Sequence, residues 1–194
     1  MTDMSRQVID EQAGERINGY VTDMLALEQH LKTALAGQIA DLDEAGEFRI
    51  ALEKLHAVSE NHITTLEALT TRREQNVGGV SKVVKKAVSS VLGLGAAAID
   101  FVRTEKLPKD LRDDYTAISL AYVGYLMLHT SALTLGDTEV ADTAAIHMRD
   151  SAESMMAIQR IIPAATIALL ITEGLQTDSS VLPGIGDTVQ SSWR

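Results

Sequence analysis

TAISLAYVGYLMLHTSALTL, residues 116–135, decides the fold, because it contains no Asp, Glu, Lys or Arg. A run of twenty uncharged residues must be hidden from water, either in a bilayer or inside a protein. Ser, Thr and His side chains dilute its hydrophobicity, and the segments before it carry many charges that lipid does not accept. The run therefore predicts the central helix of a soluble bundle, apolar on all sides, without stable membrane insertion.

Three more long helices are expected around this run. Apolar residues recur at three- and four-residue intervals, which is the spacing of one helix face. The predicted helices cover residues 5–42, 47–73, 109–135 and 138–173. We expect Gly136 to end the third helix, Asp137 to cap the fourth, and Pro163 to kink it.

The lengths of the connections predict how these helices are arranged. Short joints link the first helix to the second and the third to the fourth, and short joints make antiparallel neighbours. About thirty residues separate the two pairs, with an apolar stripe of their own. Two helical hairpins joined by one long crossover are typical of the ferritin-like bundle. The predicted fold is therefore all-α: a ferritin-like antiparallel four-helix bundle with an extra helical crossover between helices 2 and 3.

Composition narrows the functional classes. The chain of 194 residues has no Cys, which excludes disulfides, zinc–thiolate sites, iron–sulfur clusters and thiol catalysis. The first residues lack the apolar core of a signal peptide, so a cytoplasmic location is expected. The net charge of −10 argues against nucleic-acid binding. No nucleophile elbow or phosphate-binding loop is present.

The chain divides into a bundle, residues 1–173, and a tail, residues 174–194. The tail is rich in Ser, Thr, Gly and Asp and is expected to be flexible. Its apolar residues recur every four positions, so an alternative is a docking peptide that orders on a protein partner. Residues 76–112 carry four more basic than acidic residues, which predicts a modest basic patch on the crossover. Exposed stripes there are expected to join copies into a homo-oligomer.

Two polar residues stand within apolar stripes and are the first candidates for a site. Glu28 lies on the inward line of the first helix, and His62 lies on that of the second. Carboxylates and imidazole on facing helices are ligands for iron or manganese. In the last helix His147, Asp150 and Glu153 are spaced by three, as a degenerate ligand set or as a solvated ridge.

A complete two-metal site lacks parts. Ser59 stands where an acidic partner of His62 is expected, and the third helix has no acidic residue between Asp114 and Asp137. The interpretation is one metal ion or none, with no cofactor as the first choice and iron or manganese as the alternative, held by Glu28, His62, Asp150 and Glu153. A further expectation is a buried polar ladder of aromatic residues, Tyr122, Tyr125 and His129, that reaches Glu28 or His62.

Three stretches carry a resemblance to a known family. DMLALEQHLKTAL (23–35), ENHITTLEAL (60–69) and GDTEVADTAA (136–145) resemble the bacterial ferritin-like stress proteins of the YciF type. The resemblance implies the bundle and a stress-related setting, with Glu28 and His62 in ligand positions. At the positions of the family's remaining acidic ligands, this chain has Val58 or Ser59 and Ala121 or a neighbour. The resemblance therefore implies a degenerate metal site.

The tail stretch LPGIGDT (182–188) is similar to the C-terminal cargo peptides of ferritin-like proteins in encapsulin shells. Three hypotheses follow for the whole chain. The first is a bundle with little or no catalytic activity that acts through oligomerisation or partner binding, in the shells if the tail is a cargo peptide. The second is an atypical iron or manganese protein that handles iron or peroxide. The third is a membrane-associated helical protein.

Overall fold

The computed structural model describes residues 3–42, 46–77 and 106–193, and within these ranges it contains helices and no strand. The four long helices are α1 (Asp3–Ala40), α2 (Glu47–Val77), α4 (Lys106–Leu135) and α5 (Thr138–Thr172). A 3-10 turn, η1 (Ser179–Val181), and a short helix, α6 (Leu182–Ser191), follow. The protein is all-α, as predicted.

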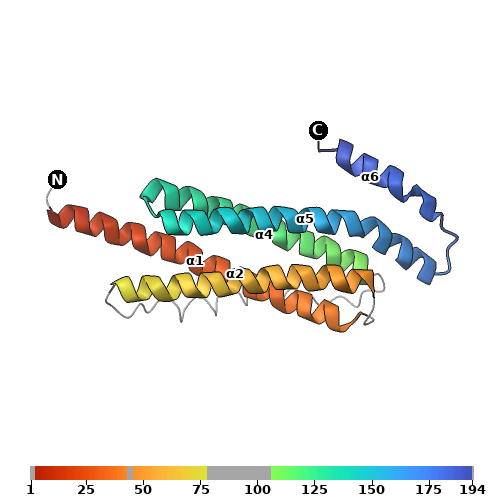
Figure 1. The fold of residues 1–194 in the computed structure, drawn as a ribbon, viewed down its shortest axis with the longest axis horizontal. Coiled ribbons are helices and arrows are strands. Elements are labelled where there is room, and N and C mark those ends of the chain that lie inside the picture. Colours follow the sequence, from red (N-terminus) through yellow and green to blue (C-terminus); the bar gives the residue numbers. More distant parts are fainter. Residues whose placement is uncertain (1–2, 43–45, 78–105, 194) are drawn as a thin grey trace.

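The long helices form an antiparallel bundle (Figure 1). The helix pairs in contact are α1 with α2, α4 with α5, α1 with α4, and α2 with α5. In Figure 1, α1 and α5 run in one direction and α2 and α4 in the other, so each contacting pair is antiparallel. The end of α2 and the start of α4 lie at opposite ends of the bundle, which agrees with a long crossover. The crossover itself, with the predicted helix and basic patch, falls on residues 78–105, outside the described residues.

Local chemistry sets the hairpin joints. Gly136 adopts a φ of +79°, a conformation that favours glycine, and ends α4. The Asp137 side chain caps α5 by accepting a hydrogen bond from the Val140 backbone N–H at 3.1 Å. At the other joint, Arg49 donates to the backbone carbonyls of Ile39 and Leu42, both at 3.1 Å, near the end of α1. These interactions confirm the predicted stop at Gly136 and the predicted cap at Asp137.

The core lies between the four helices and is built from aliphatic side chains with one aromatic. Tyr125 and Leu128 of α4 are fully buried, together with Leu52 and Leu66 of α2. α1 approaches α4 closely at Gly124, where an added Cβ would lie 2.5 Å from the Met24 sulfur. The small residue therefore allows these two helices to pack against each other.

The uncharged run is not buried on all sides, so the expectation of a fully enclosed third helix was wrong. α4 is a corner of the bundle, and large apolar side chains are exposed along it. Among them are Leu120 (61% exposed), Val123, Met127 and Leu133 (54% exposed). In length and composition, α4 from Leu107 and α5 would each suffice to cross a membrane.

α5 continues through Pro163 to Thr172, and its final part turns away from the axis of the first part in Figure 1, in agreement with the predicted kink. The other difference concerns the tail. The tail, expected to be flexible, contains η1 and α6, and the LPGIGDT stretch lies in α6. α6 folds back beside α5, and none of its residues is buried.

Candidate functional site

Polar side chains from all four long helices meet inside the bundle. Glu28 comes from α1, Ser59 and His62 from α2, Tyr125 from α4, and His147 and Asp150 from α5. The pairs on α2 and α5 are spaced by three residues, which places both members on one helix face. We call these six residues, Glu28, Ser59, His62, Tyr125, His147 and Asp150, the interior cluster.

Glu28 is the centre of the interior cluster. Its side chain is buried, and both carboxylate oxygens are used. Oε1 accepts a hydrogen bond from the Tyr125 hydroxyl at 2.8 Å and lies 2.8 Å from Nδ1 of His62. Oε2 accepts from the Ser59 hydroxyl at 2.7 Å. A buried carboxylate with this many partners is compensated for the loss of water.

His62 lies between two carboxylates. Its Nδ1 faces Glu28, and its Nε2 lies 3.2 Å from Oδ2 of Asp150. A neutral imidazole donates from one nitrogen only, so both hydrogen bonds form at once when both nitrogens carry protons or when one of the two carboxyl groups is protonated and donates to the other nitrogen. Asp150 is partly exposed and connects this buried chain of hydrogen bonds to the surface.

His147 packs its ring flat on that of His62. The ring centroids are 3.9 Å apart at an interplanar angle of 17°, and Tyr125 meets His147 edge-on at 4.9 Å. Burial, with the neighbouring His62, lowers the pKa of His147 to about 3, so this ring is neutral at physiological pH. Its Nδ1 is buried and has no hydrogen-bond partner within the described part of the chain.

The Tyr125 hydroxyl acts as a fixed donor. Burial raises the pKa of Tyr125 far above its ordinary value, and the adjacent Glu28 carboxylate raises it further. The hydroxyl therefore keeps its proton for Glu28. Glu28, Ser59, His62, Tyr125 and Asp150 therefore form one hydrogen-bonded network, and His147 joins it by ring packing.

A cavity of about 10 Å³ adjoins the interior cluster and offers room for one water molecule. Ser59 and Ala121 line it, beside Glu28 and His62. Small side chains therefore leave a water-sized space beside Glu28 and His62.

The structure brings together three of the four predicted metal ligands. Glu28, His62 and Asp150 are linked by hydrogen bonds, whereas Glu153 is exposed and lines a surface hollow with Lys54. The last helix is therefore neither a full ligand set nor a solvated ridge, because the His147 side chain is buried.

The predicted aromatic ladder is only partly present. Tyr125 reaches Glu28, but His129 places its Nδ1 2.8 Å from the Ala141 backbone oxygen, and Tyr122 lines a different hollow. His147 was considered with Asp150 and Glu153 but was left out of the four predicted metal ligands. Its signal was the spacing of three residues before Asp150.

The arrangement of the possible donor groups does not favour a bound metal ion. Among the residues with described side chains, no three or more His, Asp or Glu groups come together in a way that could hold a metal ion. The two histidine rings are stacked, so the lone pairs of their nitrogens lie in nearly parallel planes and do not point to one position. Both nitrogens of His62 also face carboxylates already.

Comparisons with known proteins give the fold alone. Neither the protein-family models nor the curated proteins contain a match to this chain. Among solved structures, the chain is similar to the crystal structure of a protein from Xanthomonas campestris, with a TM-score of 0.66 and 16% sequence identity. The similarity covers 84% of this chain and 99% of that chain. At this identity it supports the helical arrangement and carries no function.

Proposed function

We propose that this protein is a helical bundle with little or no catalytic activity, ferritin-like and stress-related, that acts by assembly. The interface in this proposal is the outer face of α4, which we define as Thr116, Leu120, Val123, Met127, Thr130 and Thr134. The hydrogen bonds within the interior cluster support a structural role for these polar residues. The exposed apolar side chains of α4 support the assembly.

The observation that carries the proposal is the apolar character of this outer face. Leu120, Val123 and Met127 are about half exposed or more, at 61%, 46% and 48%. The three threonines of this face, Thr116 before these residues and Thr130 and Thr134 after them, donate to backbone carbonyls of their own helix, at 2.8 to 3.0 Å. Their hydroxyl protons are therefore not free for water, and the face presents methyl groups and aliphatic chains. Continuous apolar surface of this kind marks interfaces.

The test is the mass of the full chain in solution, by analytical ultracentrifugation. We expect the wild-type chain to form a dimer or larger oligomer, and the double variant Leu120→Glu/Met127→Glu to be a monomer with unchanged helicity by circular dichroism. The matched control is Ile50→Glu, an equally exposed apolar position (51%) on α2, which should leave the oligomer intact. A monomeric wild type, a variant that still assembles, or a chain that needs detergent to stay dispersed would contradict the proposal.

An atypical iron or manganese site is the second candidate, because Glu28 and Asp150 both contact His62, one at each ring nitrogen. Metal analysis distinguishes this candidate from the assembly proposal. The protein is purified without chelator and reconstituted with iron or manganese. Our proposal expects far less than one ion per chain. About one ion per chain that is lost in His62→Gln and kept in Glu153→Gln, an exposed control, would establish the metal protein instead.

A further inference from the structure

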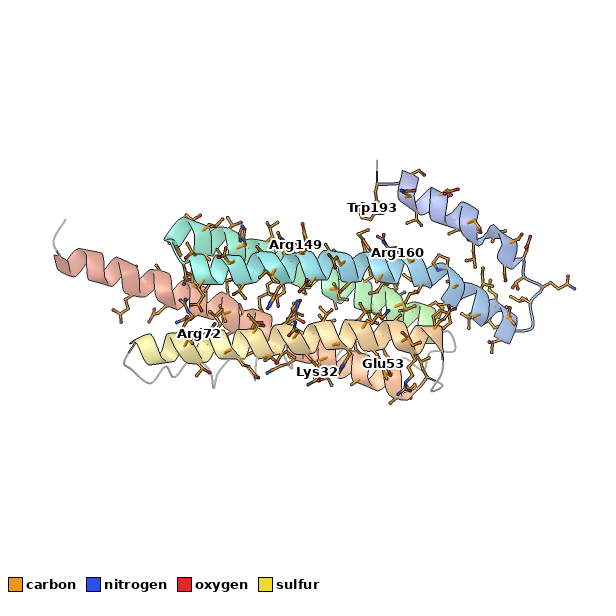
Figure 2. All side chains as sticks on the ribbon, in the orientation of Figure 1. Lys32, Glu53, Arg72, Arg149, Arg160 and Trp193 are labelled. Atoms are coloured by element: carbon orange, nitrogen blue, oxygen red, sulfur yellow. The ribbon has the colours of Figure 1, made fainter. Side chains whose placement is uncertain are left out.

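A groove separates α6 from the bundle and is distinct from both the interior cluster and the outer face of α4. Its volume is about 890 Å³. Side chains of α4, α5, α6 and the residues after α6 line it, with Tyr122, Met155 and Arg160 on the bundle side and Leu182, Val189 and Trp193 on the opposite side. In Figure 2, Arg160 on α5 and Trp193, just beyond the end of α6, face each other.

The walls of this groove suit an apolar ligand. Most of the lining consists of aromatic, methionine and aliphatic side chains. Methionine is flexible and polarisable, and it adapts to ligands of irregular shape. The volume lies within the roughly 300 to 1,000 Å³ of small-molecule sites. The polar groups of the lining are the hydroxyls of Tyr115 and Tyr122, the amides of Gln159 and Gln190, the Trp193 indole N–H and the Arg160 guanidinium.

One cation stands at the groove. Arg160 is the only charged residue that lines it among the described residues, and no ion pair joins it to any of them. Arg160 also borders the surface hollow that contains Glu153, which lies seven residues earlier on α5, but the two side chains are not bonded. An exposed, unpaired guanidinium is suited to bind a carboxylate through two parallel hydrogen bonds.

We propose that the groove between α6 and α5 binds a long-chain carboxylate of the fatty-acid type. The aliphatic chain lies against the methionine, tyrosine and tryptophan side chains, and the carboxylate binds the Arg160 guanidinium. A single anionic group is favoured, because the groove offers one cation on a chain whose net charge is −10. This inference goes beyond the proposed assembly, since Leu120, Val123 and Met127 do not line the groove.

Trp193 provides the readout, because it is the only tryptophan of the chain and it lines the groove. Laurate, titrated below its micelle concentration into the full-length protein, is expected to change Trp193 fluorescence with saturation at about one molecule per chain. Arg160→Gln should weaken laurate binding about tenfold, which is the scale of one charged hydrogen-bonded contact. Arg149→Gln, an exposed arginine of the same helix away from the groove, should bind as the wild type does. The uncharged 1-dodecanol should bind the wild type about as weakly as laurate binds Arg160→Gln.

A second pair of variants tests the location without altering charge. Gly184 and Gly186 both lie in α6, and a Cβ added at either position meets nothing within 4 Å, but only Gly186 lines the groove. Gly186→Leu should place a branched side chain in the groove and weaken laurate binding, whereas Gly184→Leu should leave it unchanged. Sedimentation of the laurate complex should show the same oligomer as the free protein.

Three results would overturn the inference. One is the absence of a saturable signal, and another is equal laurate affinity in wild type, Arg160→Gln and Gly186→Leu. The third is a fluorescence change that follows a new association of chains, which would assign the groove to a second copy. None of these depends on whether Leu120→Glu/Met127→Glu disrupts the assembly.

Discussion

Asp114 and Gln38 form a buried polar pair away from the interior cluster. The Gln38 amide donates to Oδ1 of Asp114 at 2.9 Å, while Oδ2 of Asp114 and Oε1 of Gln38 are buried without a partner within the described ranges. Burial raises the pKa of Asp114 from 3.8 to about 7, against the opposing effect of the Gln38 hydrogen bond. A proton on the Asp114 carboxyl removes its buried charge, so burial favours the neutral acid.

The raised pKa makes stability depend on pH. Between about pH 4 and 7 the unfolded chain has lost the Asp114 proton and the folded chain keeps it, so this residue destabilises the fold progressively as pH rises. Asp114→Asn removes the charge and keeps an oxygen acceptor for Gln38. We expect the variant to be more stable than wild type at pH 8, by on the order of 3 kcal/mol in free energy of unfolding, and nearly equal at pH 4.

Urea denaturation at both pH values measures this difference. Asp142→Asn, at an exposed position of α5, is the control and should show no such dependence on pH. If Asp114→Asn changes the free energy of unfolding by the same amount at pH 4 and pH 8, the carboxyl is not a neutral group in the folded protein.

At the scale of elements, the helix ends could be predicted where a residue has special backbone chemistry, as at Gly136 and Asp137. The end of α1 lacks such a residue, whereas Gly78 and Gly79 directly follow α2 in the sequence, and each helix differs by a few residues from its prediction. The tail was the larger difference. Its composition suggested a flexible segment, but apolar residues four apart allow one turn after another to face the same side, and α6 forms over Leu182–Ser191.

α6 adds little to the stability of the bundle, because none of its residues is buried. A chain ending at residue 173 is expected to unfold cooperatively with a thermal midpoint within about 2 °C of the full-length protein, as expected for a change below about 0.5 kcal/mol. Thermal melting followed by circular dichroism checks this. Loss of the cooperative transition would show that α6 and its connection are part of the fold.

At the scale of the whole molecule, the distribution of charge and apolar surface favours association with a neutral partner face. The chain carries a net charge of −10, yet the outer face of α4 lies within residues 116–135, which contain no charged residue. Two copies joined along this face keep their acidic surfaces in water. Since folding and assembly are then coupled, the thermal midpoint of wild type should rise with protein concentration, and that of Leu120→Glu/Met127→Glu should not.

The sequence by itself determined the four helices and their antiparallel order, because apolar spacing and short joints are local properties that the chain carries in any context. It also singled out Glu28 and His62, since polar residues within apolar stripes must find partners inside. Only the tertiary structure decided which partners those are: Tyr125 and His147 reach the same point from helices that are far away in the sequence. Packing also decided which side of α4 is buried. An uncharged helix carries no sequence signal to distinguish its inner face from its outer one.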